Sequence, residues 1–582
     1  MQDNTNTNQV AMLVQDFVKR YGGLEETSKI PDICGRVLAA QDEGNVCIKL
    51  EKDEIDLINS CIKEPTLQFL ISLAPASSGF FVLNNDLLYT RRNWNYEQTV
   101  RTKILKMLEK KQEDVVTIPD EEAYQNLNQR QKEAVVKMCK NHFSILTGGP
   151  GTGKTFTIAR AVKLALQMHP SFNIALAAPT GKAQERIQES IQAEVDKLGL
   201  TKIPKTSTLH SLLEENYDTV TFKHNKHNPL EIDWLIVDEA SMIDLPLMAK
   251  LLDALQDDCD QVDAHQYERR LTLVGDPFQL ASVEPGKVFG DLCRMIPREF
   301  ICELNENVRL KDSGDNMGGI TRLATDVKNG NVDEVLELLK SKEGIPQEML
   351  KGEVYQDMQE YKQVLRYIRI PAKKNSKPKD WPGFMELIAK CFGEFSLQET
   401  AEGALEHLND CHILCATRKG PFGCETMNHF VKRILEDKVA KENTGFKCPQ
   451  PIMITKNSRS LAVSNGDVGV VMPENKKVLC LPGNKIIQMV LLQDNEMAFA
   501  STIHKAQGSE YKNVIIVLPS GKEDDEKSNH TIDLLTRELL YTAITRTKGN
   551  LFIFAADDEA VIKCCKNKTT RISGLCNSIE MG

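Results

Sequence analysis

Four features are missing or scarce in this sequence, and each absence excludes a class of protein. No hydrophobic run reaches the roughly 18 residues that a membrane-spanning helix needs, so we expect no membrane attachment. The first ten residues, MQDNTNTNQV, have no basic segment leading into an apolar stretch, which argues against a secretory signal. The 16 cysteines form no C-x-x-C pair, which favours reduced cysteines in a cytoplasmic protein over a zinc site. Aromatic residues make up only 6% of the chain, so few rings can stack on nucleic-acid bases, and Phe278 and Phe499 are the candidates.

What is present is the composition of a folded globular protein. Hydrophobic residues make up 41% and charged residues 26% of the 582 residues, which excludes a disordered or fibrous chain. A chain of this length typically forms about three to five domain-sized units. The formal net charge of −10 argues against a non-specific basic coat for nucleic acid but permits a local basic channel.

Short apolar runs alternate with helical segments over most of the chain, as in parallel strands joined by crossover helices. We therefore predict an α/β fold with two tandem domains, at 116–300 and 301–575, after a separate N-terminal α+β unit at 1–115. Turn-separated runs at about 447–499 predict an all-β insertion, and the lysine-rich stretch at 351–382 predicts a flexible surface excursion. The runs that support the two sheets are Phe143–Leu146, Ile174–Ala178, Trp234–Val237, Leu271–Val274, Ile413–Ala416, Val514–Leu518 and Leu551–Ala555.

The strongest motif is GGPGTGKT at 148–155, which matches the phosphate-binding pattern G-x-x-x-x-G-K-[ST]. Glycines let backbone N–H groups close around phosphate oxygens, and the N-terminus of the following helix adds a positive dipole. We expect Lys154 to reach the β- and γ-phosphates of ATP and Thr155 to hold Mg²⁺. The loop around the phosphates would comprise Gly148, Gly149, Pro150, Gly151, Thr152 and Gly153.

Two further strand ends provide acid and amide groups. Trp234–Val237 is followed by Asp238 and Glu239, which places two carboxylates at one edge of the predicted sheet. Asp238 would hold Mg²⁺, and Glu239 would act as general base for the attacking water. Gln279 follows the run Leu271–Val274 in a tight turn, where its amide can contact both the γ-phosphate and water.

Two arginines of the second domain, Arg309 and Arg546, complete the predicted catalytic set. Negative charge develops on the transferred phosphoryl group, and an arginine finger accelerates such reactions by about 10³–10⁵. Because both arginines come from the second domain, closure of the two domains would depend on the γ-phosphate. The motifs therefore predict a motor that closes on ATP and reopens after hydrolysis.

The order of these motifs resembles that of superfamily 1 DNA helicases, which have two tandem RecA-like P-loop motor domains, over roughly 127–555. LNQRQ at 127–131 resembles the element that contacts adenine, while APTGKA at 178–183 and STLH at 207–210 resemble segments that contact single-stranded DNA. ASTIHKAQGSEY at 500–511 resembles the segment that couples DNA to ATP. The residues implied by this resemblance are Gln131 for the base; Pro179, Thr180, Lys182, His210, Thr502, His504 and Lys505 for DNA; and Gln507, Gly508 and Glu510 for the nucleotide.

Within the superfamily, ATRKGPFG at 416–423, SNGDVG at 464–469 and, more loosely, 36–50 and 83–97 resemble the RecD family. The resemblance implies 5′→3′ movement in a bacterial, nucleoid-associated exodeoxyribonuclease V complex that processes DNA ends for double-strand break repair. It also implies RecB-like and RecC-like partner subunits, with the N-terminal unit docking on the RecC-like one. Asp238 and Glu239, which ATP already requires, are the only carboxylate pair that we find for metal-assisted chemistry, so we expect the nuclease centre on a partner chain.

Two other hypotheses stay open. A stand-alone RecD-like helicase would need no partners, although longer relatives of that kind carry helix-hairpin-helix repeats for which 115 residues leave little room. A nucleotide switch or scaffold with incidental ATPase activity would not respond to single-stranded DNA. Co-purification from cells separates the first hypothesis from a complex subunit, and DNA-stimulated ATP turnover separates the second from a motor.

Overall fold

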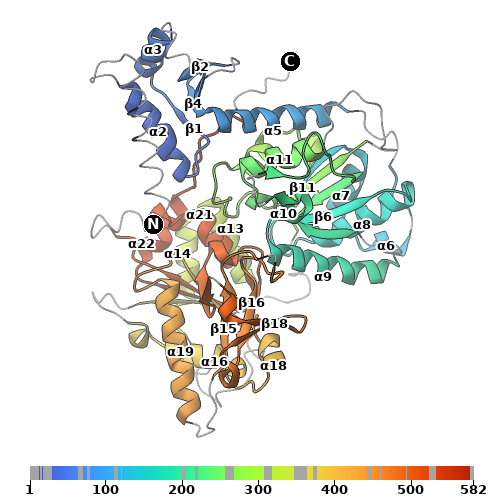
Figure 1. Cartoon of the computed structure of the whole chain (residues 1–582). Helices are drawn as coiled ribbons and strands as arrows, with labels where there is room; N and C mark the ends of the chain where they lie inside the picture. The colour runs from blue at the N-terminus through green and yellow to red at the C-terminus, as the bar shows by residue number, and fades with distance from the viewer. Residues whose placement is uncertain are drawn as a thin grey trace.

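The computed structural model is organised around four main β-sheets, and Figure 1 shows their arrangement. One sheet defines an N-terminal unit, the next two define what we call the first lobe and the second lobe, and the fourth is inserted in the second lobe. The described residues are 12, 16, 29–62, 70–74, 79–110, 116–119, 121–199, 204–216, 221–255, 268–306, 318–345, 364–370, 377–441, 448–458, 460–492, 494–522 and 533–576.

The first lobe is built on six parallel strands. They are β5 (Phe143–Gly148), β6 (Ile174–Ala178), β7 (Lys205–Thr208), β10 (Trp234–Val237), β11 (Arg270–Gly275) and β12 (Ile301–Leu304), in the sheet order β12-β5-β11-β10-β6-β7. The four inner strands are wholly buried because apolar clusters cover both faces of the sheet. β12 pairs with β5, so this sheet runs four residues beyond the limit predicted at residue 300. Helix α7 (Gln129–Lys140) precedes the first strand, and the helices between the strands are α8 (Lys154–Met168), α9 (Gly181–Leu198), α10 (Leu209–Leu213), α11 (Leu245–Leu255) and α12 (Val288–Met295).

The second lobe repeats this plan with five parallel strands. They are β13 (Leu365–Arg369), β14 (Cys411–Cys415), β20 (Ala500–Thr502), β21 (Tyr511–Leu518) and β22 (Thr547–Ala555), in the sheet order β13-β22-β21-β14-β20. Its main helices are α13 (Gly318–Asn329), α14 (Val332–Ser341), α16 (Phe384–Cys391), α19 (Cys424–Lys441), α21 (Arg537–Ile544) and α22 (Asp558–Lys566). The prediction of a flexible excursion at 351–382 was wrong for its described part, since β13 is an ordered edge strand and Trp381 is buried.

An antiparallel sheet is inserted between α19 and β20. Its strands are β15 (Gln450–Ile454), β16 (Val468–Val471), β17 (Val478–Leu481), β18 (Lys485–Gln488) and β19 (Asn495–Met497), in the order β18-β17-β16-β15-β19. Alternate side chains of these strands fill a small apolar core of their own. The sheet lies within the predicted all-β insertion.

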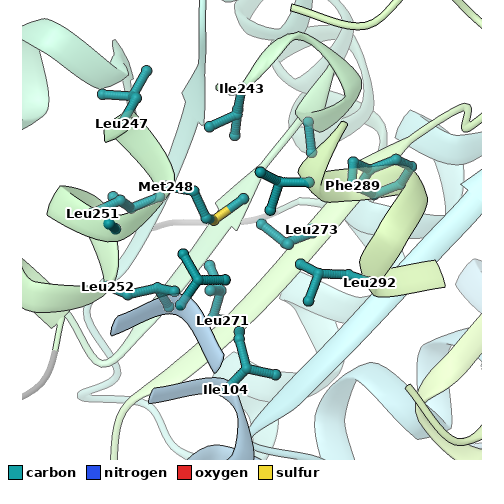
Figure 2. Close-up of a cluster of buried hydrophobic side chains, with 14 of the residues drawn as sticks. Ile104, Ile243, Leu247, Met248, Leu251, Leu252, Leu271, Leu273, Phe289 and Leu292 are labelled. Atoms are coloured by element: carbon teal, nitrogen blue, oxygen red, sulfur yellow. The ribbon is translucent and has the colours of Figure 1, made fainter. Parts of the chain in front are cut away.

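Within its described residues, the N-terminal unit contains a four-stranded sheet and the helices α2, α3 and α5. The elements are α2 (Ile30–Asp42), β1 (Cys47–Lys49), α3 (Lys52–Cys61), β2 (Ile71–Leu73), β3 (Phe81–Asn84), β4 (Leu87–Thr90) and α5 (Arg91–Glu109), with the sheet order β1-β4-β3-β2. Helix α5 leaves this unit and lies along α11 of the first lobe (Figure 1). Ile104 of α5 joins Leu252 of α11 and Leu271 of β11 in one apolar cluster (Figure 2), so the N-terminal unit shares a core with the first lobe.

The segment after α22 returns to the N-terminal unit. Gly574 N–H donates to the Glu97 carboxylate of α5 at 3.0 Å, and Val46 N–H donates to the Ile572 carbonyl at 2.9 Å. Leu575 enters the apolar cluster of the first lobe. Arg571 reaches the first lobe as well, donating to the Glu284 and Gly286 carbonyls at 3.0 and 2.8 Å. This segment of the second lobe therefore connects all three parts of the molecule.

The predicted fold class is confirmed: two tandem α/β lobes with parallel sheets, a small N-terminal α+β unit and an all-β insertion. The precise domain limits stay predictions. The cysteines at described positions form no disulfide. No helix in the described part of the chain is both long and apolar enough to cross a membrane.

Candidate active site

The phosphate-binding loop lies between the end of β5 and the start of α8. Gly151 and Gly153 have φ angles of +78° and +83°, which L residues with a Cβ rarely adopt, so glycine is needed at both turns. Lys154, the first residue of α8, folds its side chain back over the loop, and its Nζ donates to the Gly148 and Gly149 carbonyls at 2.8 and 3.2 Å. The loop thus presents a lysine ammonium and a helix N-terminus at one place, as phosphate binding requires.

Two adjacent carboxylates follow β10 at the same edge of the sheet. Asp238 Oδ1 accepts from Glu239 N–H at 2.8 Å, and Glu239 has a φ of +51°, a left-handed conformation that costs a non-glycine residue about 1–3 kcal/mol. Burial and the neighbouring Glu239 carboxylate raise the pKa of Asp238 to about 6, while the Lys154 ammonium acts in the opposite direction. Such a carboxylate gains from a nearby cation, and oxygen ligands suit Mg²⁺.

These groups line one cleft of about 810 Å³ between the lobes. The first lobe contributes the phosphate loop, the two carboxylates and Gln279, and the second lobe contributes Glu510 and Arg546. The predicted residues that line this cleft are Gln131, Gly149, Pro150, Gly151, Gly153, Lys154, Thr155, Asp238, Glu239, Gln279, Glu510 and Arg546. Groups that lie far apart in the sequence therefore face a single space.

Arg546 is buried almost completely, with 1% of its surface exposed. Its guanidinium donates to neutral oxygens of its own lobe, the Thr542 and Ser509 carbonyls at 3.2 and 3.3 Å and the Thr545 hydroxyl at 3.4 Å. Burial lowers the pKa of Arg546, and the carboxylate of Glu239 across the cleft opposes this shift. The guanidinium is thus held in place by dipoles and keeps its charge available to an anion in the cleft.

Several predicted residues lie elsewhere. Gly148 and Thr152 line a neighbouring cavity of about 400 Å³, Gln507 donates to the Leu280 carbonyl at 2.8 Å, and Gly508 packs beside Ala183. Arg309 falls outside the described residues, so its position stays a prediction.

One charged residue of the cleft, Arg186 of α9, was not predicted from the sequence. Its Nη2 lies 2.5 Å from Glu510 Oε1, which makes an ion pair between the lobes, and Lys548 lies 3.4 Å from the other Glu510 oxygen. Ala183, Arg186, Ile187 and Ser190 all line the cleft, and their spacing puts them on one face of α9. Helical periodicity could have grouped these residues, but it could not have shown that their face looks into the cleft.

The residues proposed for DNA lie at the ends of β6, β7 and β20. Pro179 and Thr180 follow β6, with the Thr180 hydroxyl capping α9 by accepting from Ala183 N–H at 3.3 Å. His210 is exposed at the start of α10 and its ring lies 5.8 Å from that of Phe222. Thr502 ends β20 and its hydroxyl accepts from Lys505 N–H at 3.4 Å.

Both predicted DNA-binding lysines contact other parts of the protein. Lys182 is half-buried against the turn at 464–467 of the insertion, and burial lowers its pKa to about 8 although Asp467 acts in the opposite direction. Lys505 forms an ion pair with Glu496 of β19. Burial lowers the pKa of His504, and Arg571 acts in the same direction.

The two aromatic candidates for base stacking, Phe278 and Phe499, differ in exposure. Phe499 is 1% exposed and packs against Phe392 and Phe395 in the core of the second lobe, so it cannot stack on a base. Phe278 is 39% exposed and has the Lys328 ammonium 4.0 Å from its ring centre.

Comparison with known proteins places this arrangement in a family. Family models match two parts of the chain: an AAA domain at residues 131–285 and a UvrD-like helicase C-terminal domain at residues 497–554. The RecBCD enzyme subunit RecD of Mycolicibacterium smegmatis is 34% identical over 511 residues, which cover 85% of this chain and 82% of that protein. The chain belongs to the RecD family. As a RecD-family protein it is an ATP-dependent helicase, with a nucleotide-binding first lobe.

Other relatives support the same assignment. RecD of Haemophilus influenzae is 33% identical over 494 residues, covering 77% of this chain and 72% of that protein. The ATP-dependent RecD2 DNA helicase of Deinococcus radiodurans is more distant, at 26% identity over 468 residues, which cover 79% of this chain but 53% of that protein.

Proposed function

We propose that this chain uses ATP hydrolysis with Mg²⁺ to move 5′→3′ along single-stranded DNA, as one subunit of a RecBCD-type complex that processes DNA ends. The observation that supports the ATP site is the single cleft lined by Lys154, Asp238 and Glu239 from the first lobe and by Arg546 from the second. A triphosphate in this cleft would contact both lobes, so its binding and hydrolysis would change how the lobes fit together.

Each group in the cleft has a chemical role in this proposal. Lys154 and the loop amides bind the β- and γ-phosphates, and Glu239 accepts the proton of the attacking water. Thr155 and Asp238 would hold Mg²⁺, which neutralises phosphate charge when bound. Gln279 orients the water, and Arg546, with Arg309, stabilises charge on the γ-phosphoryl oxygens in the transition state.

The nucleoside end would occupy the rim of the cleft near Gln131. Gln131 is held by Asn128, since Gln131 N–H donates to Asn128 Oδ1 at 2.8 Å and Asn128 N–H donates to Gln131 Oε1 at 3.1 Å. Phe156 and Ile187 supply apolar surface on the same rim. Amide groups beside apolar side chains suit an adenine base, which offers both hydrogen-bonding edges and an apolar face.

Movement along DNA requires two DNA-binding sites that shift relative to each other. The candidate contacts lie in both lobes, with Thr180 and His210 in the first and Thr502 and His504 in the second, so closure would displace one set against the other. Opening a duplex costs about 1.4 kcal/mol for each base-pair step, which hydrolysis can supply. The strand would therefore advance as the cleft closes and reopens.

Partner subunits are the part of this proposal that rests on the relatives, whose names describe subunits of a RecBCD enzyme. We infer a RecC-like chain against the N-terminal unit and a RecB-like chain that supplies the nuclease, in the bacterial cytoplasm. The N-terminal unit shares an apolar core with the first lobe, so a partner bound there would help to orient the first lobe.

The ATP site is tested by measuring ATP turnover with and without single-stranded DNA. We expect DNA to stimulate the wild-type chain, Lys154→Ala to lose turnover while retaining DNA binding, and Glu239→Gln to bind ATP without hydrolysing it. Lys163→Ala is the matched control, because Lys163 lies on the same helix but pairs with Glu121 outside the cleft. Turnover that ignores DNA would favour an incidental ATPase.

Polarity and partners need two further measurements. Tailed duplexes should be unwound from 5′ tails, and unwinding only from 3′ tails would refute the direction. Co-purification from cells with mass determination should recover two larger chains, and recovery of the chain alone would favour a stand-alone helicase.

A further inference from the structure

The turn that presents Gln279 is held by the second lobe at three points. This turn follows β11, and its first residue, Asp276, organises it locally. Asp276 Oδ1 accepts from Phe278 N–H at 3.0 Å, and the Asp276 carbonyl accepts from Gln279 N–H at 3.2 Å. The position of Gln279 in the cleft therefore depends on where the Asp276 carboxylate is fixed.

Tyr541 of α21 fixes that carboxylate from the other lobe. Its hydroxyl donates to Asp276 Oδ2 at 2.8 Å, and both residues are buried. Burial raises the pKa of Tyr541, so the hydroxyl keeps its proton and remains the donor at neutral pH. The bond is consequently a buried contact between the lobes, beside the neighbouring cavity of about 400 Å³.

The peptide after Gln279 is held from the second lobe as well. Leu280 N–H donates to the Thr542 hydroxyl at 2.9 Å, and the Leu280 carbonyl accepts from the Gln507 amide at 2.8 Å. Gln507, which the family resemblance implied for nucleotide binding, thus contacts the Gln279 turn instead.

Helix α21 also contacts Arg546, the arginine that lines the cleft. Arg546 Nε donates to the Thr542 carbonyl at 3.2 Å, so Thr542 contacts the Gln279 turn through its hydroxyl and Arg546 through its backbone. Tyr541 also approaches the phosphate loop, since a Cβ added to Gly149 would lie 3.2 Å from the tyrosine hydroxyl. Tyr541 and Thr542 lie where the phosphate loop, the Gln279 turn and Arg546 meet.

We propose that Tyr541 and Thr542 are positioning residues that tie Gln279 to Arg546, so that closure of the second lobe places both side chains on the γ-phosphate together. This inference rests on the ATP site proposed above. Neither residue lines the main cleft, so neither is expected to bind the nucleotide itself. Their effect should appear in the rate of the chemical step and in its response to DNA.

The first test is Tyr541→Phe, which removes the hydroxyl and keeps the ring. We expect the kcat for ATP to fall about 10- to 100-fold, as misplacement of a reacting group by about 1 Å can cost, while the Kd for a fluorescent ATP analogue changes less than about threefold. Stimulation by single-stranded DNA should fall with kcat. Tyr367→Phe is the matched control, because Tyr367 also donates to an aspartate, Asp558, at 2.8 Å but within the second lobe.

Thr542 provides a pair of variants that differ only in the hydroxyl. Thr542→Val keeps the side-chain shape and removes the acceptor for Leu280 N–H, whereas Thr542→Ser keeps the acceptor. Thr542→Val should therefore lower kcat and Thr542→Ser should restore most of it. If Tyr541→Phe failed to fold, this pair would decide the question by itself.

A double variant tests whether Tyr541 acts through Gln279. If it does, Tyr541→Phe combined with Gln279→Ala should turn over ATP no more slowly than Gln279→Ala alone. A kcat for Tyr541→Phe and Thr542→Val within twofold of wild type would overturn the inference, and so would losses that multiply in the double variant or a loss of nucleotide affinity in place of kcat. Absence of ATP turnover in the wild type would instead refute the proposed function.

Discussion

The first lobe has two neighbours, and its contacts with them differ. Against the N-terminal unit it forms a continuous apolar core, in which Ile104 of α5 and Met248 of α11 are fully buried (Figure 2). Its contacts with the second lobe include single apolar side chains, with Leu280 in the second lobe's cluster and Leu575 in the first lobe's. They also include polar pairs, among them Tyr541–Asp276 and the ion pairs Arg186–Glu510 and Lys287–Glu538, the last at 3.1 Å.

The difference indicates which neighbour can move. Separating an apolar core exposes its whole surface to water at about 25 cal/mol per Å², so the N-terminal unit should follow the first lobe as one body. Polar contacts can exchange with water or with phosphate oxygens at little net cost, so the second lobe can open and close. We therefore expect the change in shape to occur at the cleft between the two lobes, where the proposed ATP site lies.

The largest expected effect comes from removing the guanidinium of Arg546, a charged group that the second lobe contributes to the cleft. Arg546→Ala should lower kcat for ATP by about 10³-fold, within the range for arginine fingers, with ATP binding retained. Steady-state turnover and nucleotide titration measure both quantities. Arg369→Ala serves as control, because Arg369 pairs with Asp558 in the second lobe away from the cleft. An unchanged kcat would mean that the two lobes do not share the reaction.

A cavity in the apolar core shared by the N-terminal unit and the first lobe should lower stability and leave ATP turnover unchanged. Ile104 is fully buried, so Ile104→Ala should lower the free energy of unfolding by about 2–5 kcal/mol, while the folded enzyme keeps its kcat. Leu73→Ala removes a side chain that is 45% exposed in the N-terminal unit and should have little effect. Thermal unfolding and turnover at a low temperature separate the two quantities. A large loss of kcat would show that the apolar joint also takes part in the cycle.

A third prediction concerns pH at the same joint. Burial raises the pKa of Glu97 to about 7, despite hydrogen bonds from Tyr89, Ser573 and Gly574 that act in the opposite direction. Because the folded value lies above the unfolded value of 4.5, this group's stabilising contribution is complete below pH 4.5 and is lost as pH rises through 7. At about 1.4 kcal/mol for each pKa unit, the loss is at most about 3 kcal/mol.

Glu97→Gln should remove this pH dependence, since the amide stays neutral. Melting temperatures of both proteins between pH 5 and about 8 would check it, with the wild type falling relative to the variant as pH rises. Parallel curves would show that Glu97 is ionised throughout.

The smallest expected effect concerns the DNA contacts. If Lys505 binds DNA phosphate as proposed, Glu496 would compete for it, so Glu496→Gln should strengthen binding of single-stranded DNA about two- to fivefold and Lys505→Gln should weaken it by less than about tenfold. Lys505→Gln should also reduce the slope of log affinity against log salt by about one. Lys512→Gln, whose lysine pairs with Asp410, is the control. Equal salt slopes in both lysine variants would exclude a phosphate contact at Lys505.

The cleft could be predicted from sequence because its first-lobe groups come from contiguous motifs at strand ends. The phosphate loop and the Asp238–Glu239 pair each follow a buried apolar run, and topology places such ends at one edge of a parallel sheet. β6 and β10 were predicted to the residue for the same reason. Edge strand β7 was missed because its sequence, KTST, has no apolar residue, and edge strand β13 was missed because its short apolar pattern lies within a polar, lysine-rich stretch.

Contacts between lobes were not predictable. Arg186 lies on an ordinary amphipathic helix, and its pairing with Glu510 joins residues 324 positions apart. Lys182 is partly buried because the insertion packs against α9, and the sequence around Lys182 does not predict this contact. A contiguous motif can be recognised in the sequence because it binds a ligand of fixed shape. A contact between lobes depends on residues that are distant in the sequence and meet only after both lobes have folded.

The return of residues 571–575 to the N-terminal unit has a consequence for synthesis. Gly574 is translated 477 positions after its partner Glu97, a delay of about 25 to 95 seconds at 5–20 residues per second. Until Leu575 has been made, it cannot take its place in the apolar cluster that includes residues of α5. The contacts between α5 and residues 571–575 therefore cannot form until long after α5 itself has been made, whatever the speed of the folding steps between them.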